Sequence, residues 1–138
     1  RVFKETLRMY PPLVMLPRRA LEPVTIGGVD MPAKTIVFAS PYTLHFREDL
    51  FPQPDRFDPD RFLPEAEAAR HRSSWIPFGV GPRVCIGNHF ALMEGPIVMA
   101  TWMRKARITL EPRDLVADRF ATLRPKGEVP ARVTKVTG

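Results

Sequence analysis

Cysteine and long apolar runs are both scarce in this 138-residue sequence. Cys85 is the only cysteine, so an internal disulfide is excluded, and one free thiol fits a reducing compartment. The longest apolar candidate, residues 90–103, contains Glu94 and falls short of the roughly eighteen apolar residues that span a bilayer. We therefore expect a soluble, cytoplasmic chain without a membrane span. Both the presence and the absence of a membrane anchor further upstream are compatible with this sequence.

Glycine is also scarce beside proline, with eight glycines against sixteen prolines. Proline fixes φ and removes a backbone donor, so it interrupts regular structure. Most of the prolines lie between residues 11 and 82, and we predict an irregular, turn-rich middle. The length fits about one domain. The sequence opens on Arg1 inside a helical pattern, without an initiator methionine, and we expect a fragment of a longer protein.

Acidic residues are fewer than basic ones, 15 against 21, which gives a net charge of +6 and a pI near 10.1. Such an excess is compatible with nucleic acid, an anionic membrane or an acidic protein as partner. The basic residues are scattered singly, which argues against nucleic acid. A solvated surface whose excess is balanced by an absent part of the protein explains the charge equally well.

The most distinctive stretch, residues 78–87, reads Phe-Gly-Val-Gly-Pro-Arg-Val-Cys-Ile-Gly. Its three glycines permit positive φ and a close approach of the backbone to whatever Cys85 faces. An apolar helical pattern starts at Asn88, and the positive end of a helix stabilises a thiolate just ahead of it. A thiolate is a soft donor to iron, and Arg83 suits a carboxylate. A lone cysteine is more often an inert buried thiol, but these neighbours favour a ligand.

This stretch resembles the haem-binding signature of the cytochrome P-450 family of haem-thiolate monooxygenases, Phe-x-x-Gly-x-Arg-x-Cys-x-Gly. Its fixed positions are filled by Phe78, Gly81, Arg83, Cys85 and Gly87, and Gly79 stands at its first free position. The resemblance implies haem b (iron protoporphyrin IX), with Cys85 as the axial ligand to the metal and Phe78 shielding its sulfur. It also implies that Arg83 and Arg19 hold the propionates, with Arg18 as the competitor of Arg19, and that Gly79 and Gly87 belong to the cofactor-binding backbone.

A second motif lies in the helical pattern of residues 2–10, which Pro11 and Pro12 end. Glu5 and Arg8 are three positions apart and share a face. An isolated pair of this kind is usually a surface ion pair worth a fraction of a kcal/mol. The resemblance implies instead the family's buried Glu-x-x-Arg helix, joined by Arg61 from Phe-Asp-Pro-Asp-Arg-Phe at residues 57–62. We interpret this triad as structural.

Further elements follow from local patterns. Strands are predicted at residues 24–26, 29–32 and 35–39 around Gly27-Gly28, and at 108–110, 121–123 and 129–136. Residues 65–72 suit a short exposed helix or loop. Residues 90–103 are apolar nearly all round, which predicts a helix buried on most faces, with a kink or a restart at Pro96. His45 departs from the family's pattern, and we expect a structural histidine.

The fold class that we predict is α+β, mostly helical with small peripheral β-sheets and long ordered coil. The resemblance implies that residues 1–138 are the C-terminal (proximal) haem-binding segment of a cytochrome P-450 domain. It also implies that Leu13, Val14 and Met15 line the substrate pocket and that the turn at Phe120 and Ala121 reaches into it. Ordinary packing explains the same apolar residues.

The implied activity is the insertion of one oxygen atom from O2 into a small apolar organic substrate, with electrons from a ferredoxin or flavoprotein reductase. The basic residues Arg70, Arg72, Arg104 and Lys105 are candidates for docking that donor. We expect this fragment to be inactive without the missing part. Two alternatives remain: a cysteine hydrolase in which His45, His71 or His89 is the base for Cys85, or a basic binding module without catalysis.

Overall fold

The computed structural model describes residues 1–111, 116–118 and 122–136. Its first half contains α1 (Val2–Met9), β1 (Leu16–Arg19), β2 (Val24–Ile26), β3 (Val29–Met31), β4 (Ile36–Ala39) and α2 (Pro41–His45). Its second half contains η1 (Pro59–Phe62), α3 (Pro64–Ala69), η2 (Gly81–Arg83), α4 (Asn88–Lys105), β5 (Ala106–Leu110), β6 (Ala117–Asp118), β7 (Arg124–Pro125) and β8 (Ala131–Lys135). Helices with small sheets confirm the predicted α+β class.

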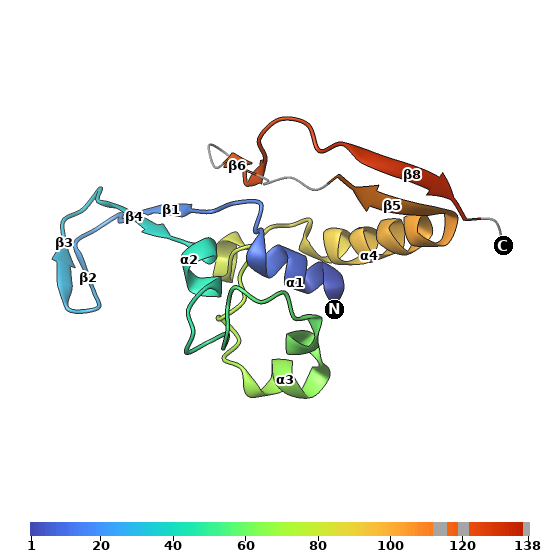
Figure 1. Ribbon diagram of the computed structural model, residues 1–138. Helices are drawn as coiled ribbons and strands as arrows, with labels where there is room; N and C mark the ends of the chain where they lie inside the picture. The colour runs from blue at the N-terminus through green and yellow to red at the C-terminus, as the bar shows by residue number, and fades with distance from the viewer. Residues whose placement is uncertain (112–115, 119–121, 137–138) are drawn as a thin grey trace.

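The helix predicted at residues 2–10 is confirmed as α1, which lies at the centre of the molecule between α4 and the coil that carries α3 (Figure 1). Its last backbone bond runs from the Tyr10 N–H to the Thr6 carbonyl at 2.8 Å. Pro11 follows and has no N–H to continue the helix. The buried face of α1 carries Glu5 and Arg8 beside Leu7 and Met9, so this helix brings an ion pair into the interior.

Four two-stranded antiparallel sheets pair β1 with β4, β2 with β3, β5 with β8 and β6 with β7 among the described residues. The predictions at 24–26, 29–32 and 35–39 are confirmed as β2, β3 and β4, and those at 108–110 and 129–136 as β5 and β8. The prediction of a strand at 121–123 is wrong for residues 122 and 123, because the strand β7 begins only at Arg124. Residue 121 lies outside the described part.

The middle of the chain, from Phe46 to η2, is coil with single short helices, as the prolines predicted. It supplies much of the small core, in which α1 packs against aromatic residues of the coil. Its buried apolar residues include Leu7, Met9, Phe51, Phe62 and Ile76. The core therefore lies where α1 meets the coil that leads to the cysteine.

Helix α4 runs without interruption through Pro96, so the predicted restart there is wrong, and the kink stays a prediction. Burial on most faces is also wrong for this chain, because Trp102 is 60% and Met103 75% exposed and no residue of α4 is buried. An apolar helix needs neighbours to be covered, and α1 packs on only part of it. A Cβ on Gly95 would lie 2.3 Å from Cζ of Phe3, so the missing side chain lets the two helices meet.

Candidate functional site

The loop before α4 folds back on itself around Cys85. Gly79 and Gly81 have φ of +77° and +75°, in the left-handed region that favours glycine. The Cys85 N–H donates to the Phe78 carbonyl at 2.9 Å, and the Val84 N–H donates to the Gly81 carbonyl at 3.0 Å. Gly87 does not need positive φ, contrary to our expectation, because it caps the N-terminus of α4 with φ of −87°.

The Cys85 thiol is exposed, and the prediction that a helix begins just after it is confirmed by α4. The Asn88 N–H donates to the Cys85 carbonyl at 3.3 Å, so the residue is joined to the first turn of that helix. A Cβ on Gly87 would lie 3.9 Å from the sulfur. The sulfur is therefore presented to an incoming group at the N-terminus of α4, and the interpretation as an inert buried thiol is not supported.

The two arginines that the resemblance assigned to propionates are both exposed. Arg83 is the last residue of η2, within the cysteine loop, and Arg19 is the last residue of β1. A Cβ on Gly79 would lie 3.7 Å from Cδ1 of Leu16, so the start of β1 adjoins this loop. Within the described residues neither guanidinium makes a hydrogen bond or an ion pair, whereas that of Arg18 donates to the Pro17 carbonyl at 2.8 Å. Both guanidiniums are therefore available to an acidic ligand.

The structure brings Glu5, Arg8 and Arg61 together. Arg8 donates to both Glu5 oxygens, with Nε–Oε2 at 2.8 Å and Nη2–Oε1 at 2.9 Å, and both side chains have no exposed area. The Arg61 Nε lies 3.5 Å from Glu5 Oε1, and its Nη2 donates to the Gln53 carbonyl at 2.8 Å. The shared carboxylate separates two cations, which is the arrangement a buried pair of arginines requires.

Arg8 also binds the last residue of α2 and the coil that follows it. Its Nη1 donates to the His45 carbonyl at 2.9 Å, and its Nη2 to the Pro54 carbonyl at 2.7 Å. The Asp58 N–H donates to Glu5 Oε1 at 2.8 Å. These bonds satisfy the charges of Glu5 and Arg8 and attach α1 to the proline-rich coil, since a buried ion pair is tolerated only when its remaining donors and acceptors are bonded.

His45 is fully buried, and the expectation of a structural histidine is confirmed. Its Nδ1 lies 3.0 Å from the Arg8 carbonyl, and its Nε2 accepts the Ile76 N–H at 2.9 Å. Burial lowers the pKa of His45 to about 4, so the ring is neutral at pH 7. With both nitrogens engaged, this ring is not available as a base.

Trp75 and Arg70 belong to the surroundings of the loop, and no sequence pattern singles out Trp75. Trp75 contacts Phe78 and Phe62 edge-on, with ring centroids 6.5 and 5.4 Å apart. The Arg70 guanidinium lies over Phe51 and Phe62 at 4.6 and 5.2 Å, and it donates to the Arg61 carbonyl. Arg70, one of the predicted docking residues, is half-buried and its guanidinium is engaged by these contacts.

The predicted pocket residues are only partly described. Leu13 and Met15 are exposed and Val14 is half-buried, while Phe120 and Ala121 lie outside the described residues. The Leu123 N–H donates to the Pro12 carbonyl at 2.9 Å, so the chain near β7 adjoins residues 13–15. A cavity of about 340 Å³ lies beside it, lined by Thr6, Tyr10, Val116, Ala117, Leu123, Arg124 and Pro125.

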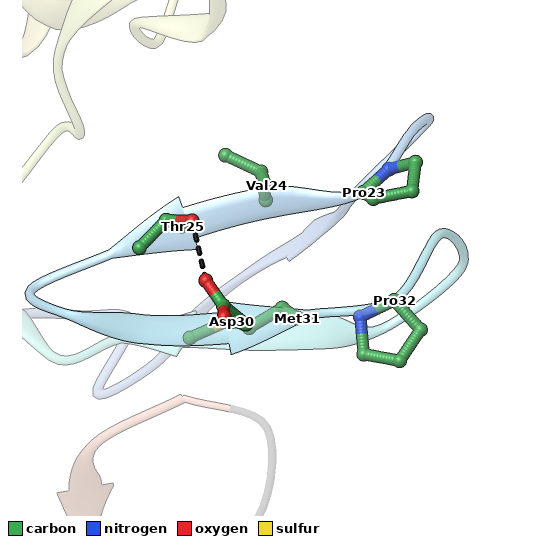
Figure 2. Close-up of a pocket in the computed structure, with 6 residues that line it drawn as sticks. All are labelled: Pro23, Val24, Thr25, Asp30, Met31 and Pro32. Carbon is green, nitrogen blue, oxygen red and sulfur yellow. Dashed lines mark hydrogen bonds between the residues drawn. The ribbon is translucent and has the colours of Figure 1, made fainter.

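A second hollow, of about 330 Å³, lies on the β2–β3 hairpin (Figure 2). Its lining comes from one hairpin and its flanking prolines, and Thr25 donates to Asp30 across it at 2.6 Å. It contains none of the predicted site residues. We interpret it as ordinary surface.

The donor set fits a cofactor that brings most of its own iron ligands. Among the described residues, no group of three or more His, Cys, Asp or Glu could hold a metal ion. One exposed cysteine sulfur with two free arginine side chains suits iron held in a porphyrin, which needs a sulfur ligand and cations for its carboxylates. In the part of the chain that the structure describes, no helix is long and apolar enough to cross a membrane.

Comparisons with known proteins agree with this geometry. A family model described as Cytochrome P450 matches residues 1–129. Cytochrome P450 4c3 of Drosophila melanogaster is 41% identical over 133 residues, covering 95% of this chain and 25% of the relative. Cyclooctatin synthase of Streptomyces melanosporofaciens is 45% identical over 100 residues, covering 72% of this chain and 22% of the relative.

Solved structures agree as well. The retinoic acid-bound cyanobacterial CYP120A1 superposes with a TM-score of 0.90 at 28% identity, covering 98% of this chain and 32% of that one. The cytochrome P450DA heme domain gives 0.88 at 28% identity, covering 97% and 30%. The chain thus spans about a quarter of the length of the curated relatives cited above. It belongs to the cytochrome P450 family, whose cofactor is haem b.

Proposed function

We propose that this chain is the C-terminal haem-binding segment of a haem-thiolate monooxygenase. The observation that carries the proposal is the exposed Cys85 thiol, held at the N-terminus of α4 by a loop with left-handed turns at Gly79 and Gly81. Family membership supports haem b as the group that this thiol binds. Bound haem would supply the activation of O2 for insertion of one oxygen atom into an organic substrate.

The residues of this chain have distinct tasks in the proposal. Cys85 donates its anionic sulfur to iron, and Arg83 and Arg19 bind the two propionates by charge-assisted hydrogen bonds. Phe78 keeps water from the sulfur, and the backbone at Gly79 and Gly87 leaves room for the ring. The triad of Glu5, Arg8 and Arg61 does not touch the cofactor, and it fixes α1 to the coil that precedes the loop.

The substrate and electron donor belong to the whole protein. Leu13, Val14, Met15, Phe120 and Ala121 are proposed to line one side of a pocket for a small apolar substrate, since apolar side chains offer burial without fixing hydrogen bonds. The electron donor is a ferredoxin or flavoprotein reductase with an acidic face. Arg72, Arg104 and Lys105 are exposed and remain the proposed docking cations, since Arg70 is engaged.

The carbon monoxide difference spectrum of the ferrous full-length protein tests the proposal. We expect the red-shifted thiolate band in the unsubstituted protein and its loss in Cys85→Ser. Ser73→Ala serves as a control, because Ser73 lies outside the cysteine loop, and should keep the band. A protein without haem, or one whose band persists in Cys85→Ser, would contradict the proposal.

A cysteine hydrolase is not favoured by the geometry. Its nucleophile needs a base within hydrogen-bond reach, and within the described residues no histidine bonds the Cys85 thiol. His45 is engaged at both nitrogens, and His71 Nδ1 accepts the Ser73 N–H at 3.2 Å. A basic binding module would explain the net charge and would leave the cysteine loop without a purpose.

A further inference from the structure

His45 is a junction between three segments that lie far apart in the sequence. It ends α2, its Nδ1 is 3.0 Å from the Arg8 carbonyl on α1, and its Nε2 is 2.9 Å from the Ile76 nitrogen. The Arg8 Nη1 in turn donates to the His45 carbonyl at 2.9 Å. The ring also meets Phe51 edge-on, with centroids 6.1 Å apart, so packing and hydrogen bonds together fix its orientation.

The two partners of the ring determine its tautomer. A carbonyl can only accept, so Nδ1 carries the proton and donates to Arg8. A backbone N–H can only donate, so Nε2 has no proton and accepts from Ile76. The neutral ring with its proton on Nδ1 satisfies both partners at once. Burial favours the same neutral form, because an uncharged ring loses less hydration than a charged one.

A short run of backbone bonds leads from Ile76 to the cysteine. The Ile76 carbonyl accepts the Gly79 N–H at 3.0 Å, which closes the turn that opens the loop. One residue before Gly79, the Phe78 carbonyl accepts the Cys85 N–H at 2.9 Å. The residue whose N–H binds His45 is therefore the residue whose carbonyl closes the first turn of the cysteine loop.

We propose that His45 is a positioning residue for Cys85, acting through the Ile76 peptide. The proposal rests on the proposed haem ligation by Cys85. His45 is buried and its ring is fully engaged, so it touches neither cofactor nor substrate. Its neutral ring fixes the Ile76 peptide relative to α1, and the loop then presents the sulfur in one orientation.

Two substitutions separate the two bonds of the ring. His45→Gln places an amide oxygen near the position of Nε2, so it keeps an acceptor for Ile76 and loses the donor to Arg8. His45→Asn places an amide nitrogen near the position of Nδ1, so it keeps that donor and loses the acceptor. Each variant loses one buried hydrogen bond, so a purely structural role predicts equal effects.

The measurements use the full-length holoprotein. We expect His45→Asn to raise the exchange rate of the Ile76 amide about tenfold, which is the loss of one typical hydrogen bond, and to shift part of the ferrous carbon monoxide band away from the thiolate position. We expect His45→Gln to keep both close to the unsubstituted protein. The midpoint temperature of thermal unfolding should fall by a similar amount in the two variants.

Equal spectra and equal exchange in the two variants would overturn the proposal and leave His45 as a packing residue. If His45→Asn does not fold, the exchange rate of the Ile76 amide in the unsubstituted holoprotein is the test. A rate as fast as that of an exposed loop would contradict its hydrogen bond to His45 and overturn the proposal. Absence of a thiolate band in the unsubstituted protein would instead remove the proposed function. The two failures are therefore distinguishable.

Discussion

The ion pair of Glu5 and Arg8 is the most demanding feature at the scale of single residues, because neither side chain has exposed area. Each charge loses its hydration on folding, and only the pairing and the bonds to coil carbonyls compensate for it. The pair could be predicted from its spacing and the resemblance. Its partners at His45, Pro54 and Asp58 could not, since they come from the end of α2 and from a coil whose path no periodicity specifies.

Glu5→Gln should destabilise the folded protein strongly. It removes the negative charge between two arginines and leaves Arg8 buried without a counterion, a change that typically costs about 3–5 kcal/mol. Denaturant unfolding of the full-length protein measures the loss. The control is Asp49→Asn, which breaks the exposed pair with Arg47 and should leave the midpoint nearly unchanged. Similar shifts in the two variants would contradict the importance of burial.

The lowered pKa of His45 makes stability depend on pH. An unfolded histidine titrates near 6.5 and this one near 4, so between these values the unfolded chain binds more protons. Stability from this group is therefore full above pH 6.5 and falls as the pH drops toward 4, by at most about 1.4 kcal/mol per pH unit. Unfolding free energies from pH 7 to 4.5 should fall less steeply in His45→Gln. Parallel curves would contradict the expectation.

At the scale of elements, regular patterns were predictable and irregular ones were not. The spacing of apolar residues with a proline stop indicated α1, and a glycine pair between β-branched residues indicated β2 and β3. Strand β1 was missed because Leu-Pro-Arg-Arg has neither alternation nor β-branched residues, and only pairing with β4 makes it a strand. Helix α2 was missed because its five residues show no period; its signals are Ser40, whose side chain accepts the Thr43 N–H, and Pro41 in the first turn.

Gly95→Ala should weaken the packing of α1 on α4. Alanine favours a helix interior by about 1 kcal/mol over glycine, but the new methyl would lie 2.3, 2.4 and 2.8 Å from three ring atoms of Phe3. The whole ring must move, and overpacking of this kind costs about 1–3 kcal/mol. Urea unfolding of the full-length protein measures the difference.

Two further variants test the cause. Phe3→Leu combined with Gly95→Ala should recover part of the loss, because the two substitutions act on one contact. Thr101→Ala, on an exposed turn of the same helix, should be neutral or slightly stabilising. A stabilised Gly95→Ala protein would contradict the close approach of the two helices.

At the scale of the whole molecule, the described chain has a core around α1 and a long helix left uncovered. The apolarity of α4 was predictable, but its burial was not, because hydrophobic periodicity indicates what a helix could bury and not what covers it. Large apolar side chains along α4, including Phe90, Ile97 and Trp102, are about 60% exposed. Contiguous apolar area of this kind needs a partner surface, and the chain spans about a quarter of its curated relatives.

The isolated 138-residue chain should therefore behave differently from the full-length protein. We expect it to self-associate or to bind an apolar dye such as ANS, with Trp102 emitting as a water-exposed indole. We also expect no thiolate carbon monoxide band after haem is added, because the open loop leaves one face of the porphyrin in water. Light scattering, dye fluorescence and difference spectra, each compared with the full-length protein, measure these properties. A monomeric chain that binds no dye and ligates haem through Cys85 would show that residues 1–138 form the complete haem site by themselves.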